Sequence, residues 1–180
     1  MTSIWAEIEA GADPSVDLAL PVPEAVFRAI GHILCQWAFF EQHLNQALGR
    51  LGSHNGAIFD ERLVSASFKK RLGAWEKLAA PMFRNDGPRG HIAKVRKRAC
   101  DLKDVRDEIA HGTWSLGDES ITLTTYKYGA EMNMRDHDLD ALSLEKIAAS
   151  ISEISAALWK LDRIYSVRYP VEQLDPRPVS

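Results

Sequence analysis

Apolar residues recur at helical spacing in several long stretches of the chain, and one stretch also carries the charged residues that suggest a function. Between residues 90 and 112 the apolar residues lie three to four positions apart, as on a helix that packs one side against a core: Ile92, Val95, Ala99, Leu102 and Ile109. The pattern predicts a helix that ends near His111, because a glycine such as Gly112 commonly terminates a helix.

Three other stretches have the same period. A first long helix is predicted from Pro23 to Gly52, and its expected apolar column is Phe27, Ile30, Leu34, Trp37, Leu44, Leu48 and Leu51. After a polar break, helical spacing recurs over residues 57–64 and again from Phe68 to Ala79. The last helix is predicted to start near Ser143 and carries a heptad stripe: Leu144, Ile147, Ile151, Ile154, Leu158, Leu161 and Tyr165. Such a narrow stripe is typical of packing between long antiparallel helices or across a dimer.

Beyond Gly112 the period changes to that of strands. Residues 114–116 and the Thr- and Tyr-rich residues 121–128 predict a β-hairpin, with a third strand at residues 131–134. We therefore expect a mainly α fold. It is an antiparallel bundle of four to five helices, with a small β-hairpin at about residues 113–135 between the helix that ends at His111 and the last helix. Residues 1–22 are expected to form an N-terminal arm, 23–168 the domain and 169–180 a C-terminal tail.

Composition limits the classes of protein to consider. With 180 residues the chain is long enough to bury a core. It contains neither a membrane-length apolar stretch nor a secretory signal, so we expect a cytoplasmic protein with no membrane partner. Cys35 and Cys100 are expected to be small core residues, and neither has a Cys or His at zinc-ligand spacing. No metal site and no cofactor are predicted.

The net charge of −3 hides a basic segment. Between Lys69 and Arg106 there are twelve basic but only four acidic residues, which favours an anionic partner such as nucleic acid. The alternative is a set of solvated helix faces. The candidate nucleic-acid-binding residues are Lys69, Lys70, Arg71, Lys94, Arg96, Lys97, Arg98 and Lys103.

Two charged residues interrupt the apolar columns. Arg106 falls between Leu102 and Ile109, and Glu41 falls between Trp37 and Leu44. A guanidinium cannot shed its charge, so on a packed face it must meet an acid or open into a polar cleft. We expect Glu41 within salt-bridge or one-water reach of Arg106, and the alternative is that both heads extend to water.

His111 follows Arg106 by five residues, which places the two side chains about 140° apart around an ideal helix. They would not share a face by default. A left-handed turn at Gly112 is expected to free His111, so that the two side chains converge at the mouth of a cleft.

Residues 106–112, Arg-Asp-Glu-Ile-Ala-His-Gly, resemble the motif of the HEPN superfamily, which comprises helical bundles with an Arg followed after a few residues by a His. Many prokaryotic members have Arg-Asn-x-x-Ala-His-Gly, and the match is at Arg106, Ala110, His111 and Gly112, with Asp107 in place of Asn. The helical pattern extends the resemblance over most of residues 23–167. The resemblance implies a metal-independent endoribonuclease of the toxin or antiphage type. It also implies a homodimer in which the motifs of two chains face one cleft.

RNA carries its own nucleophile, the 2′-OH, so a histidine and an arginine can suffice for cleavage. His111 would take the 2′-OH proton and Arg106 would stabilise the phosphorane, leaving a 2′,3′-cyclic phosphate. Glu41, Asp107 and Glu108 are candidate supporting residues. The expected partners are RNA, a second copy of the chain and an antitoxin or operon partner protein. The alternative, which Asp107 favours, is an inactive HEPN-like module for nucleic-acid binding or dimerisation.

Overall fold

A computed structural model describes residues 22–54, 65–116, 121–127 and 133–168 of the chain. The described part contains the helices α2 (Glu24–His54), α4 (Phe68–Ala79), α5 (Asp86–His111) and α6 (Ala141–Arg168), with a short 3-10 turn at Ala80–Met82. Three strands, β1 (Thr113–Leu116), β2 (Ile121–Lys127) and β3 (Asn133–Asp138), lie between α5 and α6. The expected mainly α bundle with a small β insertion is confirmed. The predicted arm except Val22, the predicted helical piece 57–64 and the tail 169–180 fall outside the described residues.

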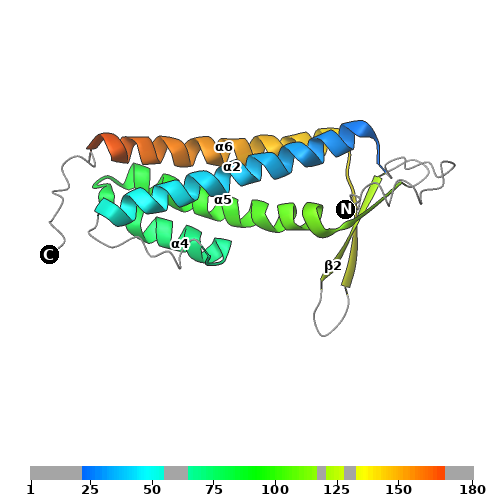
Figure 1. Cartoon of the computed structure of the whole chain (residues 1–180), viewed down its shortest axis with the longest axis horizontal. Helices are drawn as coiled ribbons and strands as arrows, with labels where there is room; N and C mark the ends of the chain where they lie inside the picture. The colour runs from blue at the N-terminus through cyan, green and yellow to red at the C-terminus, as the bar shows by residue number, and fades with distance from the viewer. Residues whose placement is uncertain (1–21, 55–64, 117–120, 128–132, 169–180) are drawn as a thin grey trace, which may run out of the picture.

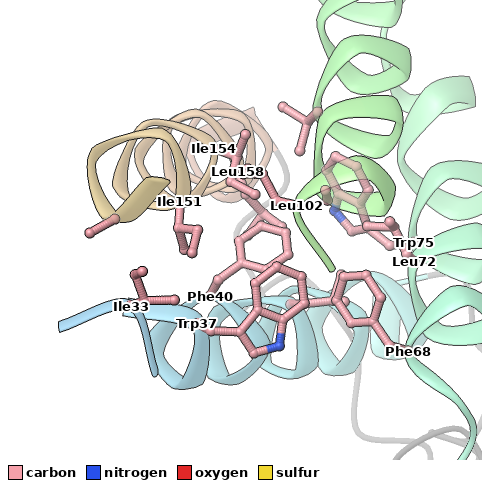
Figure 2. Packing of buried hydrophobic residues seen from close by; sticks show 14 of the residues in the cluster. Ile33, Trp37, Phe40, Phe68, Leu72, Trp75, Leu102, Ile151, Ile154 and Leu158 are labelled. Atoms are coloured by element: carbon pink, nitrogen blue, oxygen red, sulfur yellow. The ribbon is translucent and has the colours of Figure 1, made fainter. Parts of the chain in front are cut away.

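The helices pack antiparallel around a shared core. Helix α2 lies along α6, α5 packs on both of them, and α4 covers one end of the bundle (Figure 1). The strands lie at the opposite end, where α5 ends and α2 begins (Figure 1). Aromatic rings fill the centre, where Trp37 packs between Phe40 and Phe68 with ring centroids 5.6 and 4.9 Å away (Figure 2).

The buried face of α2 differs from the predicted column. Phe27 and Leu34 are 52% and 39% exposed, and Cys35 is exposed as well. Trp37, Leu44, Leu48 and Leu51 are buried as expected, and Ile30 is partly buried. The other core positions of α2 are Val26, Ala29, Ile33, Phe40 and Ala47. Helix α2 carries two overlapping apolar columns, and the choice between them depends on where α5 and α6 dock.

The heptad stripe of α6 packs inside its own chain. All its residues except the partly buried Ile147 are in the core: Leu144, Ile151, Ile154, Leu158, Leu161 and Tyr165. The stripe therefore serves the antiparallel bundle, which was one of its two expected uses. It no longer supports a dimer.

The sheet is antiparallel in the order β1-β2-β3. The expected hairpin with a third strand is confirmed, and β3, Asn133–Asp138, extends four residues beyond the predicted 131–134, of which 131 and 132 lie outside the described residues. Trp114, Leu123 and His137 are opposite one another in the register and so share one face of the sheet. The Trp114 indole donates a hydrogen bond to the carbonyl of Ile109 (3.2 Å), which fixes the sheet against the end of α5.

Candidate functional site

Arg106 lies on the packed side of α5, as its spacing predicted. Its guanidinium carbon is 5.4 Å from the ring centroid of the buried Trp37, a cation–π distance. Its Nη1 donates to Oδ1 of Asp107 at 2.9 Å, and its side chain is 24% exposed. Within the described part of the chain, its buried Nε has no hydrogen-bond partner. Arg106 is thus held by packing and still has N–H groups to donate.

Asp107 accepts hydrogen bonds from two cations, Arg106 and Lys103. The bond from Lys103 to Asp107 raises the pKa of the Lys103 ammonium above its ordinary value of 10.5. The carboxylate of Asp107 therefore offsets positive charge at the position where the HEPN motif usually has a neutral amide.

Glu41 and Arg106 form no direct ion pair, so the salt-bridge form of the expected contact is wrong, and contact through one water stays a prediction. Glu41 instead accepts from Nη2 of Arg71 at 3.0 Å, and Nη1 of Arg71 donates to Oδ1 of Asn45 at 2.8 Å. Arg71 follows Phe68 by one helical turn, and Phe68 packs against Trp37, so α4 brings its own guanidinium to α2. Arg71 is only 8% exposed, which also makes its predicted contact with nucleic acid wrong. Its position among the apolar residues of α4 was the signal that the sequence analysis missed.

The expected convergence of His111 and Arg106 does not occur within one chain. Helix α5 continues to His111, and the N–H of Gly112 donates to the carbonyl of Glu108 at 2.8 Å. Gly112 is extended, with φ −77° and ψ 162°, so the predicted left-handed turn is wrong. The imidazole is exposed on the outside of the helix and stays about 140° around it from Arg106.

Glycine is required at position 112 because a side chain would not fit there, and not because of the backbone conformation. A Cβ at this position would lie 2.4 Å from Cδ1 of Leu123 and 2.7 Å from the carbonyl oxygen of Glu108. Strand β2 can therefore seat against the end of α5 only if residue 112 has no side chain.

Glu108 faces a histidine that the sequence analysis assigned no role. Nε2 of His137 lies 3.9 Å from Oε2 of Glu108, which is one helical turn before His111. Only the pairing of β3 with β2 places His137 there, so no pattern along the chain indicated it.

Apart from Arg71, the candidate nucleic-acid-binding residues divide into two groups. Ion pairs engage Lys69 with Asp104 (3.7 Å), Arg96 with Glu76 (2.8 Å), and Lys103 with Asp107. The second group is exposed and forms no ion pair with any described residue: Lys70, Lys94, Lys97 and Arg98. The last three line a cleft between α5 and α6.

In the described ranges, no three His, Cys, Asp or Glu side chains are grouped so that they could hold a metal ion. None of the helices that the structure describes is both long and apolar enough to span a membrane. No protein-family model, curated protein or solved structure matches the chain.

Proposed function

We propose that the protein is a metal-independent endoribonuclease whose site combines Arg106 of one protomer with His111 of a second copy. The state of Arg106 carries the proposal. A guanidinium held on the face of Trp37, with a side chain that is 24% exposed and an Nη2 that donates to no described residue, is prepared to bind an anion at the surface. The resemblance of residues 106–112 to the HEPN motif suggests that this anion is an RNA phosphate.

The chemistry needs a base, an anion-stabilising group and the substrate's own hydroxyl. The imidazole of His111 takes the 2′-OH proton as O2′ attacks phosphorus, and Arg106 donates hydrogen bonds to the developing phosphorane. The bond between phosphorus and O5′ then breaks, the leaving O5′ takes a proton from water, and the imidazolium of His111 returns its proton to the solvent. The products are a 2′,3′-cyclic phosphate and a 5′-OH end.

Two copies are invoked because one chain holds the two groups on different sides of α5. Leu34 lies one turn before Trp37 on α2, and Phe27 lies two turns further back on the same side. Both are exposed, so α2 carries apolar surface for a second copy to cover, and Leu34 is one turn from the Trp37 that Arg106 contacts. The proposal requires that a second copy docked there place its exposed His111 next to Arg106.

The direct test is cleavage of structured RNA in EDTA, followed by analysis of the ends. The protein should cut the RNA and leave cyclic phosphates. Arg106→Ala should lower the rate by about 10²–10³, as the loss of an oxyanion donor does, and His111→Ala should abolish cleavage. Arg28→Ala and His32→Ala are matched controls at exposed positions of α2 and should cleave normally. Cleavage that EDTA abolishes, or that persists in His111→Ala, would refute the proposal.

A second candidate, an inactive nucleic-acid-binding module, is favoured by the two hydrogen bonds that Asp107 accepts from Arg106 and Lys103. This carboxylate competes with phosphate for Arg106. Asp107→Asn removes the charge and keeps the shape, so in a ribonuclease it should raise the cleavage rate. RNA binding without cleavage by both the wild type and Asp107→Asn would favour the module.

A further inference from the structure

The side of α5 that faces α6 contains a cleft that the proposed catalytic pair does not use. The cleft has a volume of about 500 Å³ and opens between the first half of α5 and the middle of α6. Small-molecule sites commonly have volumes of this order. From Lys97, one of its lining residues, to Arg106 the helix rises about 14 Å and turns through about 180°, so the cleft lies on another side of α5 than the proposed cleavage site.

The cations of the cleft are available to a ligand. Lys94 and Lys97 are exposed and form no ion pair with the described residues, and Arg98 donates only to the hydroxyl of Ser150 (3.2 Å). Arg96, on the same helix but outside the cleft, is paired with Glu76 at 2.8 Å. Cations without an ion-pair partner among the described residues therefore gather on one side of α5.

The rest of the lining is not that of a simple anion site. Val95 and Ile154 are 5% and 6% exposed and provide an apolar floor. Asp101 and Glu153 are exposed members of the lining, and neither forms an ion pair with a described cation. Cations, an apolar surface and carboxylate acceptors within one cleft match the three parts of a nucleotide.

We propose that this cleft binds a nucleotide unit of single-stranded RNA, an inference that takes its ligand class from the proposed function. Lys94, Lys97 and Arg98 bind phosphates, and the base packs on the floor of Val95 and Ile154. The 2′-OH, the one free hydroxyl of a ribose within a strand, donates a hydrogen bond to the carboxylate of Asp101 or Glu153. DNA lacks the 2′-OH, so the carboxylates favour RNA over DNA. The cleft anchors the RNA strand at a distance from the cleavage residues.

The experiment measures binding by fluorescence anisotropy with a short fluorescein-labelled single-stranded RNA and the DNA of the same sequence. It uses the full chain carrying His111→Ala, so that the RNA is not cut. The double neutralisation Lys94→Gln with Lys97→Gln should weaken RNA binding and lower the slope of log K against log salt by about 1.4, because each lost single-strand phosphate contact contributes about 0.7. The matched control is Lys77→Gln with Arg84→Gln, two exposed cations outside the cleft, which should leave the slope unchanged.

A second pair of variants tests the carboxylates. Asp101→Ala with Glu153→Ala should reduce the preference for RNA over DNA, although it strengthens the binding of both by removing negative charge. The inference would be overturned if the cleft variant and the control lost equal RNA affinity. It would also be overturned if the alanine variant left the ratio of RNA affinity to DNA affinity unchanged. Cleavage by the wild type with no effect of the cleft variants on binding would overturn this inference alone. Normal cleft-dependent binding with no wild-type cleavage would overturn the ribonuclease alone.

Discussion

Gly112 is the residue at which α5 and the sheet meet. Its N–H closes the last turn of α5 on the carbonyl of Glu108, and the side chain of Leu123 occupies the space that a Cβ would need. Because its backbone is extended, any residue could adopt its conformation, and only the contact with β2 requires glycine.

Gly112→Ala should therefore destabilise the protein by about 1–3 kcal/mol, the usual cost of overpacking. The measurement is urea unfolding followed by circular dichroism. Gly90→Ala is the control on the same helix, since nothing lies within 4 Å of a Cβ there. It should be neutral or stabilise by about 0.5–1 kcal/mol, because alanine favours a helix more than glycine does. Equal destabilisation by the two substitutions would contradict the claim that position 112 has no room for a Cβ.

The location of Arg106 on a packed face could be predicted from the sequence, because helical spacing fixes which residues share a face. Its neighbours could not be predicted. The hydrogen bond from Arg106 to Asp107 depends on which rotamers the two side chains adopt. Trp37 reaches Arg106 only because α2 and α5 cross there. His137 reaches Glu108 through the strand register, which no local pattern encodes.

At the scale of the elements, α4 is tied to α2 by a mostly buried ion pair. The side chains of Arg71 and Glu41 are 10% and 29% exposed, and Asn45 accepts a further hydrogen bond from Arg71. Removing one partner of such a pair leaves a charge without compensation in a desolvated place.

Glu41→Ala should lower stability by about 2–3 kcal/mol, somewhat less than for a fully buried pair because Glu41 retains access to water. Arg28→Ala breaks the pair with Glu24, whose side chains are 75% and 83% exposed, and should cost less than about 1 kcal/mol. Chemical unfolding of both variants measures the difference. The double variant Glu41→Leu with Arg71→Met should regain much of the loss, and a double variant as unstable as Glu41→Ala would argue against an uncompensated charge as the cause.

Helix α6 is capped by Asp140, whose Oδ1 accepts from the N–H of Ser143 at 2.7 Å. Hydrogen bonds from Ser143 lower the pKa of Asp140 below its ordinary value of 3.8. A carboxyl with a depressed pKa in the folded state contributes stability that is present above pH 3.8 and is lost as the pH falls through the folded-state value.

Asp140→Asn should keep the cap, since an amide oxygen also accepts, and should remove this part of the acid dependence. Melting temperatures measured from pH 7 to pH 2 should fall less steeply for Asp140→Asn than for the wild type below about pH 4. If the melting temperatures of the two proteins fell in parallel with pH, Asp140 would not contribute to the loss of stability in acid.

The sequence predicted the existence and type of the described elements, because long periodic runs and Thr- and Tyr-rich segments are strong signals. The buried face of α2 was mistaken, since Phe27 and Leu34 belong to a second apolar column that the bundle leaves outside. Competing columns of similar strength are resolved by tertiary packing, which local pattern does not contain.

At the scale of the whole molecule, the large apolar residues that remain exposed in the described part all lie on α2 and α6: Phe27, Leu34, Phe39, Leu142, Trp159, Ile164 and Val167. The core stripe of α6 is used within the chain, so any contact with a second copy must use other surface. The composite site that we propose uses the part of this exposed apolar surface nearest to Trp37. In this site Arg106 of one chain works with His111 of the other chain, and not with His111 of its own chain.

Subunit mixing tests this requirement most directly. Arg106→Ala is expected to retain at most about 1% of the rate, and His111→Ala none. In a two-fold dimer that exchanges subunits, half of the dimers are mixed, and each mixed dimer restores one of its two sites. An equal mixture should therefore regain about a quarter of the wild-type rate of RNA cleavage in EDTA. A mixture as inactive as its two components, under conditions where subunit exchange is demonstrated, would contradict the composite site.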